Sequence, residues 1–134
     1  MRVVLDTNIF ISGIFWTGES HKTILAWKAE KFTLVTSLQI ISETIRVLSD
    51  FKINISEDMI KGWVDLIIRN SIIVEPKEKI KIVQDDQKDD MFVEAAVAGN
   101  ADYLVSQDNH LLKLKEFREI KIITPEEFNR ILNR

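Results

Sequence analysis

Acidic side chains stand at four separated points of this chain from which they could act together. Asp6 directly follows a short apolar run, and Asp108 lies just past another. Asp89 opens a segment with helical spacing, and Glu43 lies within a further one. Carboxylates gathered in one place repel one another and raise their own pKa values, and a hard divalent cation relieves that repulsion. With no cysteine and only two histidines in the chain, we expect all-oxygen ligation that selects Mg²⁺ or Mn²⁺ over zinc or copper.

The chemistry that such a site serves best is hydrolysis of a phosphodiester by water. A divalent cation polarises the phosphoryl oxygen, lowers the pKa of bound water and stabilises the leaving oxygen. The chain contains no glycine-rich phosphate-binding loop and no G-x-S-x-G elbow, so the sequence supports neither nucleotide binding by such a loop nor a serine hydrolase.

Three of these positions also have purely structural interpretations. Asp6 could form an Asx turn that caps the next segment. Asp89 or its neighbour Asp90 could cap the following helix, and Asp108 could cap a short helix through Leu111. Only the joint arrangement, with several acids at one edge of a sheet, favours the chemical interpretation.

Glu43 has its own alternative. At 100° per residue it falls about 40° outside the apolar arc of its helix, so it could point along the surface toward a cleft. It could equally be a solvated residue paired with Arg46, one turn away.

The elements that would position these acids alternate between strands and helices, which predicts an α/β fold with a mostly parallel sheet covered on both faces. A short apolar run rich in β-branched residues predicts a strand buried on both faces at residues 3–5, and further strands are predicted at residues 32–35, 72–74, 103–105 and 121–123. Helical spacing begins at Ser20, and Ser56 and Thr124 are typical N-caps of later helices. Two consecutive segments, the first containing Glu43 and the second starting at Ser56, predict a helical hairpin. Ligands of open α/β sheets bind beyond the carboxyl ends of the strands, where Asp6 and Asp108 fall.

Length and charge set further bounds. The 134 residues predict a single domain spanning 1–134, and 18 basic against 21 acidic residues give a net charge of −3. Any contact with nucleic acid must therefore be local. The longest stretch without a charged residue is residues 7–18, whereas a membrane span needs about 20 apolar residues. We therefore expect no membrane partner and a cytoplasmic location.

Four blocks of this sequence resemble PIN-domain nucleases, in order along nearly the whole chain. Residues 3–9 (VVLDTNI) are similar to the opening of that family, and Ser37 followed by Glu43 on the first helix of the hairpin also resembles it. Residues 86–92 (DQKDDMF) and 101–108 (ADYLVSQD) resemble a subgroup that contains VapC-like toxins of toxin–antitoxin pairs.

The resemblance implies a three-layer α/β/α sandwich with a central, mostly parallel sheet. It also implies metal-dependent RNA cleavage by four acids that bind Mg²⁺ or Mn²⁺: Asp6, Glu43, Asp89 and Asp108. The third acid is placed at Asp89 because Phe92 then falls three residues later, as in the family pattern. The resemblance further implies that three residues orient these acids or bound waters: Asn8, Ser106 and Asp90.

The predicted function is therefore a metal-dependent endoribonuclease, acting as the toxin of a toxin–antitoxin pair. The alternative is a non-catalytic RNA- or protein-binding module that retains the fold. Predicted partners are RNA, an antitoxin protein and a second copy of the chain, which the apolar face of the hairpin could bind. RNA needs basic contacts, and Arg46 is favoured because it lies one turn from Glu43. Other basic candidates are Lys22, Lys28, Lys31, Lys113, Lys115 and Arg118.

Overall fold

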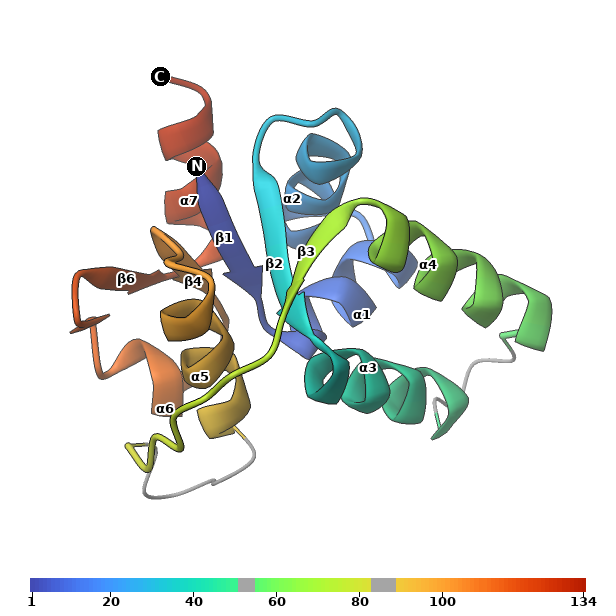
Figure 1. Ribbon diagram of the computed structural model, residues 1–134. Coiled ribbons are helices and arrows are strands. Elements are labelled where there is room, and N and C mark those ends of the chain that lie inside the picture. The colour runs from blue at the N-terminus through green and yellow to red at the C-terminus, as the bar shows by residue number, and fades with distance from the viewer. Residues whose placement is uncertain (51–54, 83–88) are drawn as a thin grey trace.

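A six-stranded sheet organises the computed structural model, which describes residues 1–50, 55–82 and 89–134 (Figure 1). The strand order is β3-β2-β1-β4-β6-β5, with β5 antiparallel to β6 and the other neighbours parallel. The strands are β1 (Arg2–Leu5), β2 (Thr33–Ser37), β3 (Ser71–Val74), β4 (Tyr103–Val105), β5 (Glu116–Phe117) and β6 (Ile120–Ile123). The helices are α1 (Thr7–Phe15), α2 (Glu19–Lys28), α3 (Leu38–Asp50), α4 (Glu57–Arg69), α5 (Asp90–Ala98), α6 (Asn109–Leu112) and α7 (Pro125–Leu132). The expected α/β class and mostly parallel sheet are confirmed.

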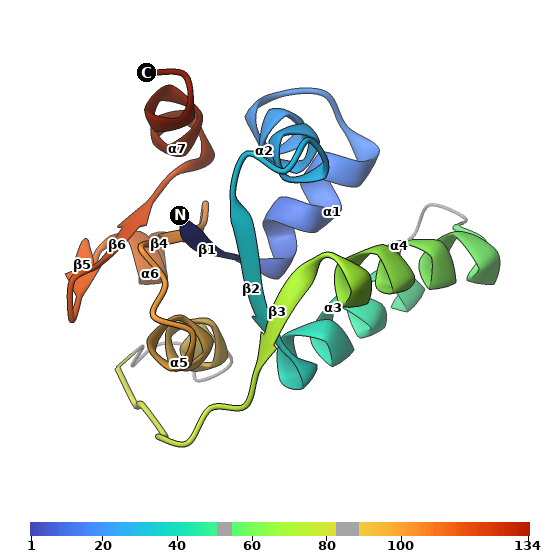
Figure 2. The same cartoon turned by 45° about the horizontal axis from the view of Figure 1, so that its top comes forward.

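Two apolar clusters lie on opposite faces of the sheet and create the three layers. Alternate residues of a strand point to opposite faces, so Val3 and Leu5 enter one cluster and Val4 the other. Helix α5 packs on the face of Val4, whereas α1, α2 and α7 pack on the opposite face. Figure 2 shows α2 and α7 separated from α5 by the sheet. Because β1, β2 and β4 are mostly buried, their apolar residues are nearly continuous in the sequence, whereas the apolar run of β3 lies near the edge of the sheet with Ile72 and Ile73 exposed.

The order in which strands are added to the sheet reverses at β1, and this reversal determines which loops lie together. The chain runs outward from β1 to β2 and β3, then returns to place β4 on the other side of β1. Leu5 is paired with Val105, and the Asp6 backbone N–H donates to the Val105 carbonyl at 3.0 Å. The residues that follow these two strands therefore lie together at the position where open α/β sheets bind ligands.

Helix α1 and strand β5 are absent from the sequence prediction. Of the residues in α1, Ile9, Phe10 and Ile11 are all buried, so the helix has no single apolar stripe to reveal it. Strand β5 is only two residues long. Residues 86–88 of the block that resembles the toxin subgroup lie outside the described residues.

The predicted hairpin is present as α3 and α4, beside the sheet in Figure 1. Ser37 Oγ accepts a hydrogen bond from the Ile40 N–H, and Ser56 Oγ accepts one from the Met59 N–H, each at 3.2 Å. Some apolar side chains of α4, including Met59 and Ile68, remain about half exposed. None of the helices in the described ranges has the length and apolar character that a membrane crossing requires.

Gly13 permits the close approach of α1 to α2, which leads to a stability prediction. A Cβ added at Gly13 would overlap the Ile24 side chain and lie 2.9 Å from the Ser20 carbonyl oxygen. We expect Gly13→Ala to lower the free energy of unfolding by about 1–3 kcal/mol, because a backbone group cannot move aside cheaply. Gly62→Ala on α4 is the matched control, since a Cβ there has open space and alanine favours helix by up to about 1 kcal/mol. Urea unfolding of both variants measures the difference, and equal effects would contradict the packing argument.

Candidate active site

Asp6 occupies the junction between β1 and α1, where its two carboxylate oxygens have different partners. Oδ1 accepts a hydrogen bond from the Asn8 backbone N–H at 3.2 Å, which caps α1. Oδ2 accepts one from the Ser106 hydroxyl at 2.7 Å. The side chain is only 3% exposed. Asp6 is therefore the helix cap that one interpretation expected, and it also faces the loop that follows β4.

The electrostatic environment of Asp6 opposes its ionisation. Burial raises its pKa above the ordinary value of an aspartate, and the negative charge of Asp108 adds to the rise. The hydrogen bonds from Ser106 and from the Asn8 N–H lower the pKa but do not cancel the effect of burial. Asp108 is thus close enough for its negative charge to oppose the ionisation of Asp6.

Ser106 connects the two acids through a single hydroxyl. While its O–H donates to Asp6, its oxygen accepts a hydrogen bond from the Asp108 backbone N–H at 2.9 Å. The residue is fully buried, so water does not compete for these bonds. Ser106 therefore ties the segment after β4 to the end of β1.

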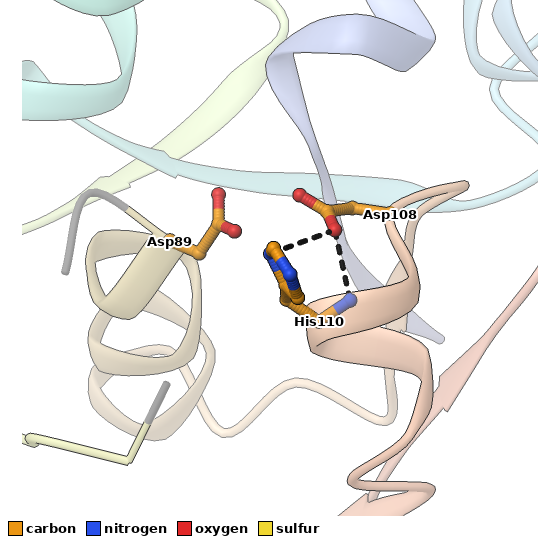
Figure 3. A group of neighbouring side chains, drawn as sticks. All are labelled: Asp89, Asp108 and His110. Carbon is orange, nitrogen blue, oxygen red and sulfur yellow. Dashed lines mark hydrogen bonds and ion pairs between the residues drawn. The ribbon is translucent and has the colours of Figure 1, made fainter. Parts of the chain in front are cut away.

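A second group of ligand atoms lies beside this pair and includes a histidine. Among the described residues, Asp89, Asp108 and His110 each offer one ligand atom, and these atoms lie within 4.8 Å of one another. Figure 3 shows Asp89 at the start of α5 facing Asp108 across the His110 ring. Asp108 Oδ1 accepts a hydrogen bond from the His110 backbone N–H at 2.8 Å and lies 3.6 Å from the ring Nδ1. Asp108 therefore caps α6, as one alternative expected, and also belongs to the ligand group.

His110 was not among the candidates derived from the sequence. Two histidines are too few for a typical zinc site, so the histidine count gave no sign of a metal ligand. The informative local feature is its position two residues after Asp108, at the start of a short helix. With His110 present, the group is not the all-oxygen set that was expected.

Glu43 lies outside that group and is held by Arg46. The guanidinium grips both carboxylate oxygens, with Nε to Oε2 at 3.1 Å and Nη2 to Oε1 at 2.5 Å. Arg46 also lies 3.5 Å from the carboxylate of Asp50. The pair of Glu43 and Arg46, which was one interpretation of Glu43, is thus present. Asp6, like Glu43, is not a member of the group of Asp89, Asp108 and His110.

The remaining predicted residues lie around the acids. Asn8 contributes its backbone N–H to Asp6, while its side chain is exposed. Asp90, buried next to Asp89, accepts a hydrogen bond from the Ile82 backbone N–H at 3.3 Å. This bond fastens the segment before α5 to the helix.

The donor set of Asp89, Asp108 and His110 fits a divalent cation. Two carboxylates supply the charge that a hard cation needs, and an imidazole is a common ligand of first-row metals. Asp89 is buried, whereas the side chain of Asp108 is 26% exposed and that of His110 is 46% exposed. The group is therefore anchored inside the protein at Asp89 and open to solvent at Asp108 and His110.

The raised pKa of Asp6 predicts that its charge weakens the metal-free fold. Because the folded-state pKa exceeds the unfolded value, the folded state binds more protons, and stability falls as pH rises from 3.8 through the folded pKa. We expect Asp6→Asn to raise the melting temperature at pH 7 in EDTA, and this gain to shrink as pH falls toward 4. Asp65→Asn is the control, since Asp65 is exposed on α4 and paired with Arg69. Thermal unfolding across this pH range measures both, and a destabilised Asp6→Asn variant would contradict the argument.

Known proteins share both the sequence pattern and the fold. The model of the PIN domain family matches residues 2–110. The crystal structure of VapBC2 from Rickettsia felis, bound to a promoter DNA fragment, matches with a TM-score of 0.63 and 18% identity, over 92% of this chain and 98% of that one. The structure of FitAB bound to the IR36 DNA fragment matches with a TM-score of 0.57 and 14% identity, over 92% and 94% of the two chains. The crystal structure of FitAcB from Neisseria gonorrhoeae matches with a TM-score of 0.55 and 10% identity, over 92% of this chain and 98% of that one.

At these identities the solved structures establish similarity of fold. Among curated proteins, none matches the chain. The family model, by contrast, covers most of the 134 residues and includes the strand ends, the hairpin and the acids. The protein therefore belongs to the PIN domain family.

Proposed function

We propose that this protein is an endoribonuclease that hydrolyses RNA phosphodiesters with a carboxylate-bound Mg²⁺ or Mn²⁺. The observation that carries the proposal is the meeting of Asp89, Asp108 and His110 beside the buried Asp6. Membership of the PIN family, whose domains are generally nucleases, supports the reaction class.

In this proposal the acids have different roles, which follow from the surroundings of each carboxylate. Asp89 and Asp108 hold the cation, and the charge of Asp6 adds to the negative potential that attracts it. When bound, the cation polarises a phosphoryl oxygen and stabilises the leaving oxygen. Ser106 keeps Asp6 and Asp108 in register, so the acids need not rearrange when substrate arrives. The oxygen of a water molecule bonds to phosphorus and gives up a proton, the bond from phosphorus to one ester oxygen breaks, and that leaving oxygen takes up a proton, so that one water is consumed.

In this proposal the pair of Glu43 and Arg46 on α3 would meet the RNA. The Arg46 side chain is 53% exposed, and its guanidinium has the fork geometry that suits a phosphate group. An RNA phosphate that draws Arg46 away would release the carboxylate of Glu43, the fourth acid of the proposed set. One residue would thus link substrate binding to completion of the site.

The proposed biological role is that of a VapC-like toxin controlled by an antitoxin. The sequence blocks around Asp89 and Asp108 resemble that toxin subgroup, and the fold matches a chain in the VapBC2 structure over nearly its whole length. We also propose that two copies pair through the hairpin, because Met59 and Ile68 leave apolar surface exposed on α4.

Cleavage of RNA should require both the metal and the carboxylates. In a mixed set of structured and single-stranded RNAs, we expect cutting with Mn²⁺ and none in EDTA. Asp6→Asn, Asp89→Asn and Asp108→Asn should each lower the rate about 100-fold or more, because loss of cation-dependent charge stabilisation costs several kcal/mol. Asp65→Asn should cut like the unchanged protein, since that acid is exposed on α4.

Two results would count against the proposed activity. Equal cutting by the Asp6→Asn and Asp108→Asn variants would identify a contaminant or a different site. Absence of cutting together with absence of Mn²⁺ binding would favour a non-catalytic binding module.

Arg46 should contribute to RNA affinity through one phosphate contact. We expect Arg46→Gln to weaken binding in EDTA about tenfold and to reduce the slope of log affinity against log salt by about one. Arg69→Gln is matched to it, because Arg69 is also an exposed arginine, paired with Asp65 at 3.3 Å on α4. Fluorescence anisotropy at several salt concentrations measures both variants, and an equal loss for the two would show that Arg46 has no special contact.

A further inference from the structure

We propose that His110 is a nitrogen ligand of the cation and that it makes the site select Mn²⁺ over Mg²⁺. This inference rests on the proposed function, which leaves the choice of metal open. The ring of His110 lies with the carboxylates of Asp89 and Asp108, on the solvent side of the group.

Although the ring of His110 is exposed, contacts of the backbone at residues 110 and 111 hold it in place. Its N–H donates to Asp108 Oδ1 at 2.8 Å, which fixes the first turn of α6, and its ring Nδ1 lies 3.6 Å from the same oxygen. Leu111, the next residue, is fully buried in the core and anchors α6 against the sheet. The ring is therefore attached to a fixed backbone position only two residues from a proposed ligand.

The two carboxylates leave a place for a cation next to this ring. Asp108 directs Oδ1 toward His110, and its other oxygen points toward Asp89 (Figure 3). Asp89 approaches from α5, so the ligand atoms come from two different elements. Since all three ligand atoms lie within 4.8 Å of one another, one ion of ordinary ligand distance can reach them with small side-chain adjustments.

The chemistry of this donor set distinguishes the two metals. Mg²⁺ demands near-ideal octahedral geometry and prefers carboxylate, carbonyl and water oxygens. Mn²⁺ also binds oxygen ligands, but it is a first-row transition metal, and such metals gain affinity from nitrogen ligands. A set of two carboxylates and one imidazole should therefore favour Mn²⁺ more than an all-oxygen set does.

The competing explanation is that His110 only supports Asp108 as an ion-pair partner. In that case its loss would disturb Asp108 and weaken the binding of both metals alike. A ligand role instead predicts a change in the ratio of the two affinities, together with a direct nitrogen–manganese coupling.

Pulsed electron paramagnetic resonance of the Mn²⁺-loaded full chain tests the direct bond. We expect ¹⁴N coupling typical of a coordinated imidazole, and its loss in His110→Gln, which places an amide in reach of the ion. His21→Gln is the matched control, because the chain has only these two histidines and the ring Nδ1 of His21 lies 2.8 Å from the Gly13 carbonyl oxygen. The coupling should persist in that variant. Bound Mn²⁺ without ¹⁴N coupling in the unchanged protein would overturn the inference.

Calorimetric titration with each metal tests selectivity. We expect His110→Gln to lower the ratio of Mn²⁺ to Mg²⁺ affinity about tenfold or more. An equal loss for both metals would overturn the ligand role and leave His110 as a support for Asp108. Circular dichroism confirms that the variant is folded. The outcomes separate the two proposals. Absence of bound Mn²⁺ overturns the ligand role of His110, and absence of binding of either metal together with absence of RNA cleavage overturns both. Bound Mn²⁺ with ¹⁴N coupling but no RNA cleavage overturns only the nuclease.

Discussion

The parallel pairing of β1 with β4 is the constraint on which the rest of the site depends. These strands are far apart in the sequence, yet Leu5 lies opposite Val105, so the residues after each strand meet at one edge of the sheet. The chain reverses its direction of travel across the sheet at this same place. Asp6, Ser106 and Asp108 consequently share one small volume, and α5 carries Asp89 into it. A register shift of one residue would turn these side chains toward other faces.

The charges brought together in this way are costly, and local hydrogen bonds offset only part of the cost. Burial and the nearby Asp108 disfavour ionised Asp6, while the Ser106 hydroxyl and the Asn8 N–H favour it. The same contacts cap α1 and, through Asp108, α6. Structural and chemical interpretations of these aspartates are therefore compatible, because one oxygen of a carboxylate can end a helix while the other remains directed at its neighbours.

Pairing between side chains distinguishes the acids further. Glu43 is gripped at both oxygens by Arg46, an exposed residue that could equally well meet a phosphate. Asp89 and Asp108 lie instead beside the imidazole of His110, which adds a nitrogen atom to the oxygen atoms of the group.

A few neighbouring residues are enough to predict several features of this protein from its sequence. Apolar runs indicated the strands, serine and threonine marked the caps of α4 and α7, and the acids at strand ends indicated the edge where Asp6 and Ser106 meet. Helix α1 was not predicted because it is apolar on several sides, whereas helical periodicity reveals only helices with a single apolar stripe. Only the tertiary structure decided that His110 joins Asp89, that Ser106 joins Asp6, and that Glu43 is held by Arg46 outside that group. The first two contacts join residues far apart in the chain, and the third selects one of two local alternatives. Packing and strand register determine the first two, which spacing along the chain does not specify, whereas the third is a contact between residues three apart on one helix.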